Sequence, residues 1–401
     1  MDVLGALLFV VAIVASVVLH EAGHMVCARM AGGKVTEFFV GFGQRLWSFR
    51  RGETEYGFKA LPVGGYVKIV GMTDLDEVPP GDEHRALKDK PARWRLLTLS
   101  AGSLTHFLIA FVLFYLLGVA FGATQADNSP TIGTVAACMT AQGSTTGCDA
   151  ATQPSPAAKA GLKAGDVITS VNGKAVSTYA QMTDTLHHLA ADKPAKLGYT
   201  APDGSKHTTT VVPIHAAQVT YSNGSIGTGA LIGLTGATTT THYNPITGFG
   251  YAGSEFGSAM VETFQGLGSI PGSIPQLFTS TVDHSQRSDN TPSSVVGAAQ
   301  VAGSAFGTEG LQGLLIVIAV VNMFIGVFNL LPLLPLDGGH IAILAYEEVR
   351  KRIYRLVRRP DPGRVDLNKL MPVTYAVLLA FVALTVLLLA ADITNPLRLP
   401  S

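Results

Sequence analysis

Four stretches of the sequence are long, apolar and almost free of charge, and they constrain the fold more than any other feature. The first runs from Val3 to Leu19, 17 residues without a charged side chain. The others are residues 96–122, 311–336 and 371–390. Uncharged runs of roughly 20 residues can cross a bilayer as helices. Only 14% of the chain is charged, whereas soluble domains carry about 25%. We therefore predict an α-helical polytopic membrane protein with four transmembrane helices.

The first apolar stretch has a second interpretation, because secretory signal peptides are also apolar and N-terminal. A signal peptide carries basic residues before its apolar region and a cleavage site of small residues after it. The sequence shows neither feature here, so we expect this stretch to be retained as a membrane helix.

Basic residues predict the orientation of the four helices. Residues 31–95 contain eleven Lys or Arg and residues 350–369 contain eight, whereas the 186 residues from 125 to 310 contain seven. Since cytoplasmic loops are enriched in Lys and Arg, we expect the long section and both termini to lie outside the cytoplasm. The 28 basic and 28 acidic residues balance, which argues against nucleic acid as a partner.

The sequence His20-Glu21-Ala22-Gly23-His24 follows the first apolar stretch directly. Residues four apart share a helix face, so both imidazoles can bind one zinc ion. Glu21 lies where it can take a proton from zinc-bound water. A polar helix end at the membrane interface is the alternative. Ionisable groups are costly in a membrane helix, which favours a functional role.

A catalytic zinc site usually has three protein ligands, and Asp337 is the candidate for the third. It follows the third apolar stretch, which enters the membrane from the outside and brings Asp337 to the side of the histidine pair. Pro332 and Pro335 interrupt the helix just before it, and irregular backbone at membrane depth is tolerated only beside a protein-lined cavity. A turn that merely ends a helix is the alternative interpretation.

Three motifs in this order resemble the site-2 protease family of intramembrane zinc metalloproteases: His20-Glu21-x-x-His24, Asn329-x-x-Pro332 and Leu336-Asp337-Gly338. The bacterial members that cleave anti-sigma factors and carry a PDZ domain are the most similar group. The resemblance implies one Zn²⁺ held by His20, His24 and Asp337, with Glu21 as general base and Asn329 holding the substrate backbone.

The same resemblance implies where the protein works and on what. The expected location is the bacterial plasma membrane, with the zinc site near the cytoplasmic side. The expected substrates are single-span membrane proteins such as anti-sigma factors, cut a second time after trimming outside the cytoplasm. The oligomeric state does not follow from the sequence.

Short β-type runs separated by glycine-rich turns occupy residues 34–70. In the resembling family this region is a membrane-associated β-sheet that pairs with extended substrate. We therefore expect Gly65 and Tyr66, together with Asn329 and Pro332, to contribute to substrate binding. An ordinary structural hairpin is the alternative.

One segment departs from the family pattern. The family commonly shows Gly-Pro-x-x-Asn early in the second helix, whereas this chain has Gly102-Ser103-Leu104-Thr105-His106. We expect His106 to be a hydrogen-bonded helix histidine. An additional metal ligand or a polar contact near the cavity are the alternatives.

In the outer section, residues 155–162 read as a short helix with an Ala-Gly-Leu turn, and residues 163–174 as a strand that ends in an Asn172-Gly173 hairpin turn. This pattern resembles a protease-associated PDZ (α+β) domain over residues 125–215, with an insertion at 136–155. Cys138 and Cys148 lie in this insertion and can form a disulfide in an oxidising compartment; two separate thiols are the alternative. Residues 216–310 read as an extracytoplasmic linker, in which aromatic residues at helical spacing indicate amphipathic helices that lie on the membrane or pack against the protein.

The complete predicted organisation is 1–33 (first membrane helix with the zinc motif), 34–94 (cytoplasmic membrane-associated β region and loop), 95–124 (second helix), 125–215 (PDZ domain), 216–310 (linker), 311–340 (third helix with the third ligand), 341–370 (cytoplasmic basic segment) and 371–391 (fourth helix). The predicted function is intramembrane zinc proteolysis. An inactive PDZ-bearing scaffold and a membrane metal transporter are the alternatives. A scaffold would have lost a ligand or the base, and a transporter would carry more ionisable residues along its helices.

Overall fold

The computed structural model describes residues 2–73, 76–139, 153–221, 226–283 and 291–395. Two compact units make up the chain. Unit 1 comprises residues 1–121 and 244–399, and unit 2 comprises residues 122–243.

Among the described residues, four helices are long and apolar enough to cross a membrane. They are α1 (Val3–Met30), α2 (Ala92–Leu116), α7 (Leu311–Asn329) and α9 (Met371–Thr394). A short π-helical segment extends α2 to Phe121. Only 11% of the most apolar part of α9 is buried, which leaves most of its surface for lipid. The four predicted membrane helices are confirmed.

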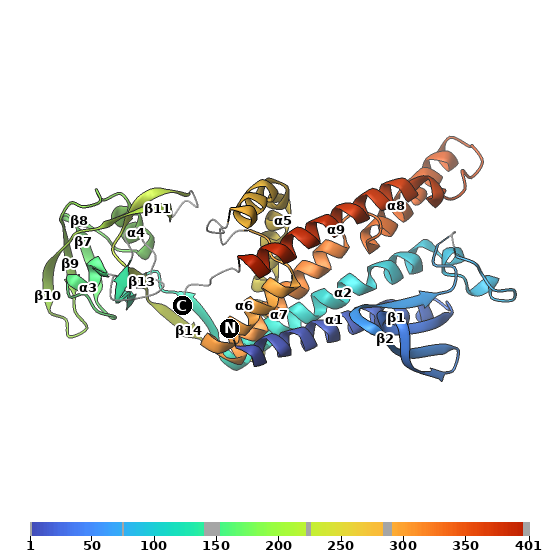
Figure 1. Ribbon diagram of the computed structural model, residues 1–401, viewed down its shortest axis with the longest axis horizontal. Helices are drawn as coiled ribbons and strands as arrows, with labels where there is room; N and C mark the ends of the chain where they lie inside the picture. Colours follow the sequence, from blue (N-terminus) through green and yellow to red (C-terminus); the bar gives the residue numbers. More distant parts are fainter. Residues whose placement is uncertain (1, 74–75, 140–152, 222–225, 284–290, 396–401) are drawn as a thin grey trace. The chain divides into compact units, whose positions relative to one another are not determined.

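Helix α2 lies between α1 and α7 and contacts both (Figure 1). Small residues allow this close approach, as is common between membrane helices. Gly23 of α1 lies so near α2 that an added Cβ would be 2.9 Å from the carbonyl oxygen of Ala101. Ala110 of α2 and Ala319 of α7 are fully buried. Side chains from these three helices can therefore reach a common region.

Two more helices of unit 1 follow unit 2 in the sequence, α5 (Thr247–Val282) and α6 (Val295–Glu309). Phe256 and Met260 of α5 pack against buried residues of α2 and α7. Phe249 and Phe264 are 60% and 57% exposed. Part of the aromatic stripe predicted in this region is therefore a packing face.

The connection from α7 to α8 (Asp337–Leu356) spans residues 330–336. Pro332 and Pro335 lie in this connection, because proline cannot continue the hydrogen bonds of a helix. The predicted third segment, 311–340, is thus divided between α7, the connection and the first turn of α8. Asp337 is the first residue of α8.

Strands β1 (Val35–Arg51) and β2 (Thr54–Ile69) form the antiparallel hairpin labelled in Figure 1, and they contain the β-type runs expected in residues 34–70. The first half of β1 pairs with both halves of β2. Phe38, for example, pairs with Val67 on one side and with Tyr56 on the other. Residues 65–69 therefore form an outer edge of this small sheet. The described part of unit 1 also contains three short 3-10 helices: η1 (Glu83–Arg85), η2 (Leu87–Asp89) and η4 (Leu367–Leu370).

Unit 2 contains several small antiparallel sheets. The largest has the order β10-β9-β7-β8, and its core residues Met182 and Leu197 are fully buried. The other pairs are β11–β12, β13–β4, β14–β3 and β5–β6. The elements are β3 (Ala123–Ala126), β4 (Ile132–Val135), β5 (Cys138–Met139), β6 (Gln153–Pro154), α3 (Pro156–Lys159), β7 (Val167–Val171), β8 (Lys174–Ala175), α4 (Tyr179–His187), β9 (Ala195–Thr200), β10 (Lys206–Val211), β11 (Ile214–Thr220), β12 (Ile226–Leu231), β13 (Leu234–Gly236) and β14 (Thr238–Thr241).

Only one cysteine of the predicted pair lies among the described residues. Cys138 is buried on β5, but Cys148 lies outside the described residues, so their pairing stays a prediction. Cys27 in α1 is a free, partly buried thiol.

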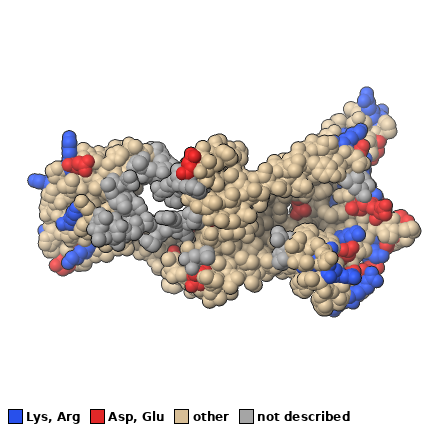
Figure 2. Space-filling model, viewed as in Figure 1, with Lys and Arg blue, Asp and Glu red and all other residues tan. Residues whose placement is uncertain are grey.

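Charged side chains of unit 1 gather at one end of the unit. Figure 2 shows blue and red residues around the β1–β2 hairpin and the end of α8, and an almost uncharged surface along the helices. An uncharged band bounded by charge is what a bilayer requires of a protein that spans it. The chain is a multi-pass membrane protein with β regions.

Candidate metal centre

Two histidines of α1 face each other across one helical turn. His20 and His24 are 8% and 4% exposed, and α1 continues past both, from Val3 to Met30. Their Nε2 atoms are 3.2 Å apart, and their rings lie edge to face with centroids 4.8 Å apart. The structure thus brings the two imidazoles together as their spacing predicts.

Asp337 reaches the same place from α8, more than 300 residues later in the sequence. Its Oδ2 atom lies 3.5 Å from Nε2 of His20 and 3.2 Å from Nε2 of His24. This oxygen is buried and makes no well-aligned hydrogen bond with a described residue. Two nitrogens and one carboxylate oxygen therefore converge on one point, all within 4.8 Å of one another.

These separations fit zinc. Nitrogen and oxygen atoms about 2.0–2.2 Å from a tetrahedral zinc ion lie about 3.3–3.6 Å from one another. The three observed separations are 3.2, 3.2 and 3.5 Å. Three protein ligands also leave the fourth tetrahedral position open, as in catalytic rather than structural zinc sites.

The outer nitrogen of His24 is fixed by the backbone of α2. Its Nδ1 donates a hydrogen bond of 2.7 Å to the carbonyl oxygen of Thr98. This bond sets the tautomer, because a neutral imidazole that donates through Nδ1 keeps a lone pair on Nε2. His24 is therefore oriented to bind a metal through Nε2.

Glu21 lies beside the pair, next to the edge of the β1–β2 sheet. A Cβ added to Gly65 of β2 would lie 3.3 Å from Cγ of Glu21, so only a residue without a side chain fits there comfortably. The backbone of Val67 also approaches the Glu21 carboxylate. The carboxylate is thus held between the histidine helix and an edge strand.

Gly102 of α2, the first residue of the Gly102–His106 segment compared with the family pattern above, provides the space for both imidazoles, a role that the motif alone did not predict. An added Cβ would lie 2.5 Å from Nε2 of His20 and 2.5 Å from Nε2 of His24. Glycine within a helix costs about 1 kcal/mol relative to alanine. A glycine inside an apolar helix is therefore the sequence signal that could have indicated a close contact between α2 and another group.

Residues 8–358 match peptidase family M50. The chain belongs to this family. It is 36% identical to zinc metalloprotease Rip1 of Mycolicibacterium smegmatis, over 99% of this chain and 98% of the relative. It is 35% identical to zinc metalloprotease Rip1 of Mycobacterium tuberculosis, over 100% of this chain and 99% of the relative.

Family M50 makes the chain a zinc metalloprotease of the site-2 protease type. The predicted family, enzyme class and zinc cofactor are therefore confirmed, and the group of His20, His24 and Asp337 is consistent with one zinc ion. A scaffold would have lost a ligand or the base, whereas His20, His24 and Asp337 lie together and Glu21 is present.

Next to the group of His20, His24 and Asp337, His106 of α2 and Asn322 of α7 form a buried pair. They are 1% and 0% exposed, and Nδ1 of His106 lies 2.8 Å from Oδ1 of Asn322. The ring of His106 is 5.0 Å from that of His20. His106 is thus the hydrogen-bonded helix histidine that we expected, and it is not part of the three-residue group that can hold a metal among the described residues.

The four predicted substrate residues lie in different surroundings. Gly65 faces Glu21, as described above. Tyr66 is turned toward β1, where its hydroxyl donates to Glu37 at 2.5 Å, and burial together with this carboxylate raises its pKa. Asn329 is the last residue of α7, and Pro332 lines an apolar cavity of about 370 Å³. The structure thus places Gly65 beside Glu21, whereas the hydroxyl of Tyr66 is bonded to Glu37 on β1.

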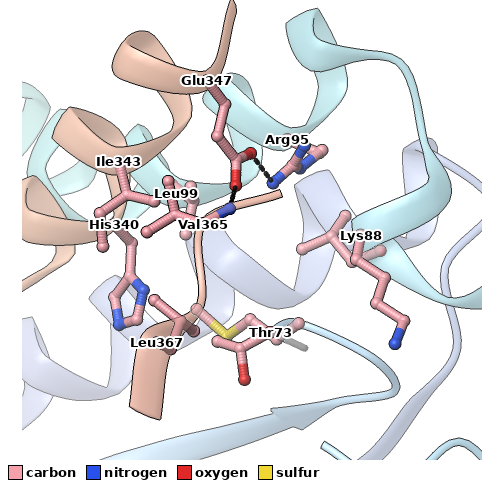
Figure 3. Close-up of a pocket in the computed structure, with 11 residues that line it drawn as sticks. Thr73, Lys88, Arg95, Leu99, His340, Ile343, Glu347, Val365 and Leu367 are labelled. Carbon is pink, nitrogen blue, oxygen red and sulfur yellow. Dashed lines mark hydrogen bonds and ion pairs between the residues drawn. The ribbon is translucent and has the colours of Figure 1, made fainter. Parts of the chain in front are cut away.

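Helix α8, which begins with Asp337, is fastened by a carboxylate further along. Glu347 accepts from the guanidinium of Arg95 at 3.4 Å and from the backbone N–H of Val365 at 2.9 Å (Figure 3). Glu347 and Arg95 border a small cavity of about 40 Å³, and His340 also lines this cavity. Glu347 therefore joins α8 to α2 and to the segment that precedes α9.

Proposed function

We propose that this protein hydrolyses peptide bonds inside the transmembrane segments of single-span membrane proteins such as anti-sigma factors. The observation that carries the proposal is the convergence of His20, His24 and Asp337 within a bundle of membrane helices, with Glu21 beside them. A metal centre in this position is placed to meet a substrate that is itself a membrane helix.

In this proposal His20, His24 and Asp337 hold the zinc ion, and Glu21 is the general base. Zinc, when bound, polarises the peptide carbonyl and lowers the pKa of a water molecule. The Glu21 carboxylate accepts a proton from the attacking water and then passes it to the leaving amine. The close fit of Gly65 and Val67 around Glu21 holds the carboxylate toward the reacting water.

The edge formed by residues 65–69 is the proposed docking site for the substrate backbone. This segment pairs with β1 on one side only, and unpaired strand edges accept a further strand. A helical substrate must unwind before its amides can reach the metal, and pairing with an edge compensates for the hydrogen bonds that are lost. Asn329 and Pro332, at the end of α7 and in the connection to α8, would hold the opposite side of the extended segment.

Unit 2 is proposed to act as an extracytoplasmic PDZ-type gate. A cavity of about 230 Å³ lies between α4 and residues 230–234, lined by Tyr179, Leu186 and Ile232 among others. A groove between a helix and a strand is the PDZ site for an extended peptide. The compact unit covers residues 122–243, so it includes strands β12 to β14 beyond the range proposed from sequence. The basic segments, by the positive-inside rule, favour a zinc site near the cytoplasmic side, and the membrane in this proposal is a bacterial plasma membrane.

The test is Glu21→Gln in proteoliposomes with a single-span reporter protein. Loss of a general base lowers catalysis by about 10²- to 10⁴-fold, while zinc content stays at one ion per chain. Glu53→Gln on the exposed turn of the hairpin is the matched control and should cleave at the wild-type rate. Wild-type cleavage by Glu21→Gln would refute the mechanism. Membrane proteins that accumulate only in cells carrying this variant would identify the substrates and test the requirement for prior trimming.

A further inference from the structure

An apolar cavity of about 370 Å³ lies between α8, α9 and the connection that precedes α8. Ala342 and Ile343 of α8 form one wall, and Val373 and Val377 of α9 form another. Every side chain that lines it is apolar, apart from the hydroxyl of Tyr346. Cavities of about 300–1,000 Å³ are typical of sites for small molecules. The lining predicts that whatever fills this cavity is apolar.

The cavity lies on the side of α8 that faces away from the metal group. Tyr346 follows Asp337 by nine residues, which is about two and a half helical turns. The two side chains therefore point to opposite sides of α8. An occupant of the cavity is distinct from a peptide bond at the metal, so the inference below does not depend on the proposed proteolytic function.

The cavity opens to the outside of the protein at one end of a membrane helix. Val373 is 59% exposed and Tyr346 is 57% exposed. Val373 and Val377 belong to the first two turns of α9, a membrane helix whose most apolar part is only 11% buried. The end of such a helix is where lipid acyl chains meet their headgroups. The surroundings of the opening are thus lipid rather than bulk water.

Basic residues gather at the same end of α9. Residues 350–369, which precede α9, contain eight Lys or Arg and two Asp, and Figure 2 shows blue residues around the end of α8. Each aspartate has a partner within the segment. Asp361 pairs with Lys351 at 3.2 Å, and Asp366 accepts from the backbone N–H of Asn368 at 3.0 Å. The segment therefore has a net positive charge beside the cavity.

Arg350 is the basic residue placed at the cavity itself. Its guanidinium carbon lies 5.3 Å from the ring centre of Tyr346, which lines the cavity. In the part of the chain that the structure describes, only the carbonyl oxygen of Gly363 accepts from this guanidinium, at 2.7 Å, and its buried Nε has no acceptor. A guanidinium has five N–H donors. Donors thus remain for a phosphate, whose geometry matches the planar fork of arginine.

We propose that this cavity binds one acyl chain of an anionic phospholipid whose phosphate accepts hydrogen bonds from Arg350. Charge complementarity favours a lipid over an uncharged apolar partner, because basic pockets beside membrane helices attract anionic headgroups. Lys369 is exposed and follows directly in front of Leu370, which lines the cavity, so it adds to this attraction.

The bound lipid would also support α8. Val365 lines the cavity, and its backbone N–H donates to Glu347 of α8 at 2.9 Å. The acyl chain therefore packs against the segment that fastens the helix on which Asp337 lies. A ligand that binds only the native state raises the thermal midpoint, so anionic lipid should stabilise the protein in detergent.

The first experiment blocks the cavity. The full-length protein is stripped of lipid in detergent and mixed with dioleoyl-phosphatidylglycerol, and native mass spectrometry counts the lipids that stay bound. The wild type should retain one lipid per chain, and both Ala342→Trp and Val373→Trp should lose it. Ala345→Trp, at an exposed position of α8 outside the cavity lining, is the matched control and should retain it. The lipid-free thermal midpoint identifies folded variants, and Val373→Trp changes a largely exposed side chain. Retention by Val373→Trp equal to that of the control would overturn the proposal.

The second experiment tests the headgroup. Dioleoyl-phosphatidylcholine has the same acyl chains but no net charge, and it competes with dioleoyl-phosphatidylglycerol in equal amounts. One basic residue near a membrane surface changes the affinity for an anionic lipid about fivefold. Arg350→Gln should therefore reduce the preference for phosphatidylglycerol about fivefold, whereas Arg352→Gln, an exposed residue outside the cavity, should keep it within about twofold. An unchanged preference in Arg350→Gln would refute the role of Arg350.

Two other occupants predict different results. If a second copy of the chain filled the cavity, Ala342→Trp would convert a dimer into a monomer and the wild type would retain no lipid. If a substrate helix filled it, Ala342→Trp would weaken binding of a single-span reporter while the count of retained lipids stayed unchanged. Either result would overturn the proposal. Loss of lipid from the two blocked variants, together with an undiminished zinc content, would support the lipid site whatever the outcome for Glu21→Gln.

Discussion

Replacing Gly102 by alanine is the sharpest test of the metal centre. The new methyl would overlap Cε1 of His20 and would lie 2.5 Å from Nε2 of both His20 and His24. Since carbon atoms in contact prefer about 3.5–4 Å, the imidazoles or α2 must move by about 1 Å. Metal sites tolerate ligand displacements of about 0.2 Å. We therefore expect Gly102→Ala to lose high-affinity zinc binding and at least about 10²-fold of its activity.

The same substitution should change the stability of the zinc-free protein much less. Overpacking costs about 1–3 kcal/mol, while alanine favours the helix over glycine by about 1 kcal/mol. The net loss in the free energy of unfolding should be no more than about 2 kcal/mol. A folded protein without zinc is the expected product, which distinguishes a blocked site from a misfolded chain.

The assay compares zinc content after dialysis, and cleavage of a membrane reporter, between Gly102→Ala and a matched helical control. Gly257→Ala in α5 is suitable, because its added Cβ would meet nothing within 4 Å. The control should keep wild-type zinc content and activity. If Gly102→Ala kept one zinc ion per chain and cleaved within about threefold of wild type, the imidazoles would not occupy the positions described here.

Three further outcomes are expected. Removal of zinc by a chelator should abolish cleavage and lower the thermal midpoint, because a ligand that binds only the native state stabilises it; readdition should restore both, and an unchanged midpoint would contradict native-state zinc binding. Glu347→Ala removes the carboxylate that Arg95 bonds and should lower the free energy of unfolding by about 1–3 kcal/mol. The double variant with Arg95→Ala should lose less than the sum of the two single losses, and strictly additive losses would show that the pair does not hold α8. Burial lowers the pKa of His187 below 6.5, against the opposing effect of Asp184. The unfolded state then binds the proton more readily, so unit 2 should lose stability as the pH falls below about 6.5. His187→Gln should reduce this slope in hydrogen exchange measured across the pH range, and an identical slope would rule out His187 as its source.

Features encoded by local periodicity could be predicted from the sequence. The four membrane helices follow from uncharged runs, and the proximity of His20 and His24 follows from a spacing of four on a continuous helix. Asp337 could be placed beside them because topology fixed its depth, and Pro332 and Pro335 marked the break before α8. These inferences need only short-range rules and the constraint of the bilayer.

Pairing between distant segments could not be predicted, because no local pattern encodes it. Strand β13 pairs with β4 across about 100 residues of sequence, which brings segments beyond residue 215 into unit 2. The first half of β1 pairs on both sides with β2, whereas the sequence showed only separate β-type runs. Phe256 and Met260 became packing residues because α2 and α7 lie opposite them.

Helix α2 explains why a family motif can change in one place and not in another. It contributes no member of the candidate metal group of His20, His24 and Asp337. Even so, Thr98 bonds His24, Gly102 contacts both imidazoles, and His106 lies beside the ring of His20. At Gly102 even a methyl group would overlap the imidazoles, so this position of the family pattern is retained. One turn later the side chain lies between α1 and α7, where Asn322 provides a hydrogen-bond partner. A histidine can therefore replace the usual asparagine there, because Oδ1 of Asn322 accepts a hydrogen bond from Nδ1 of that histidine.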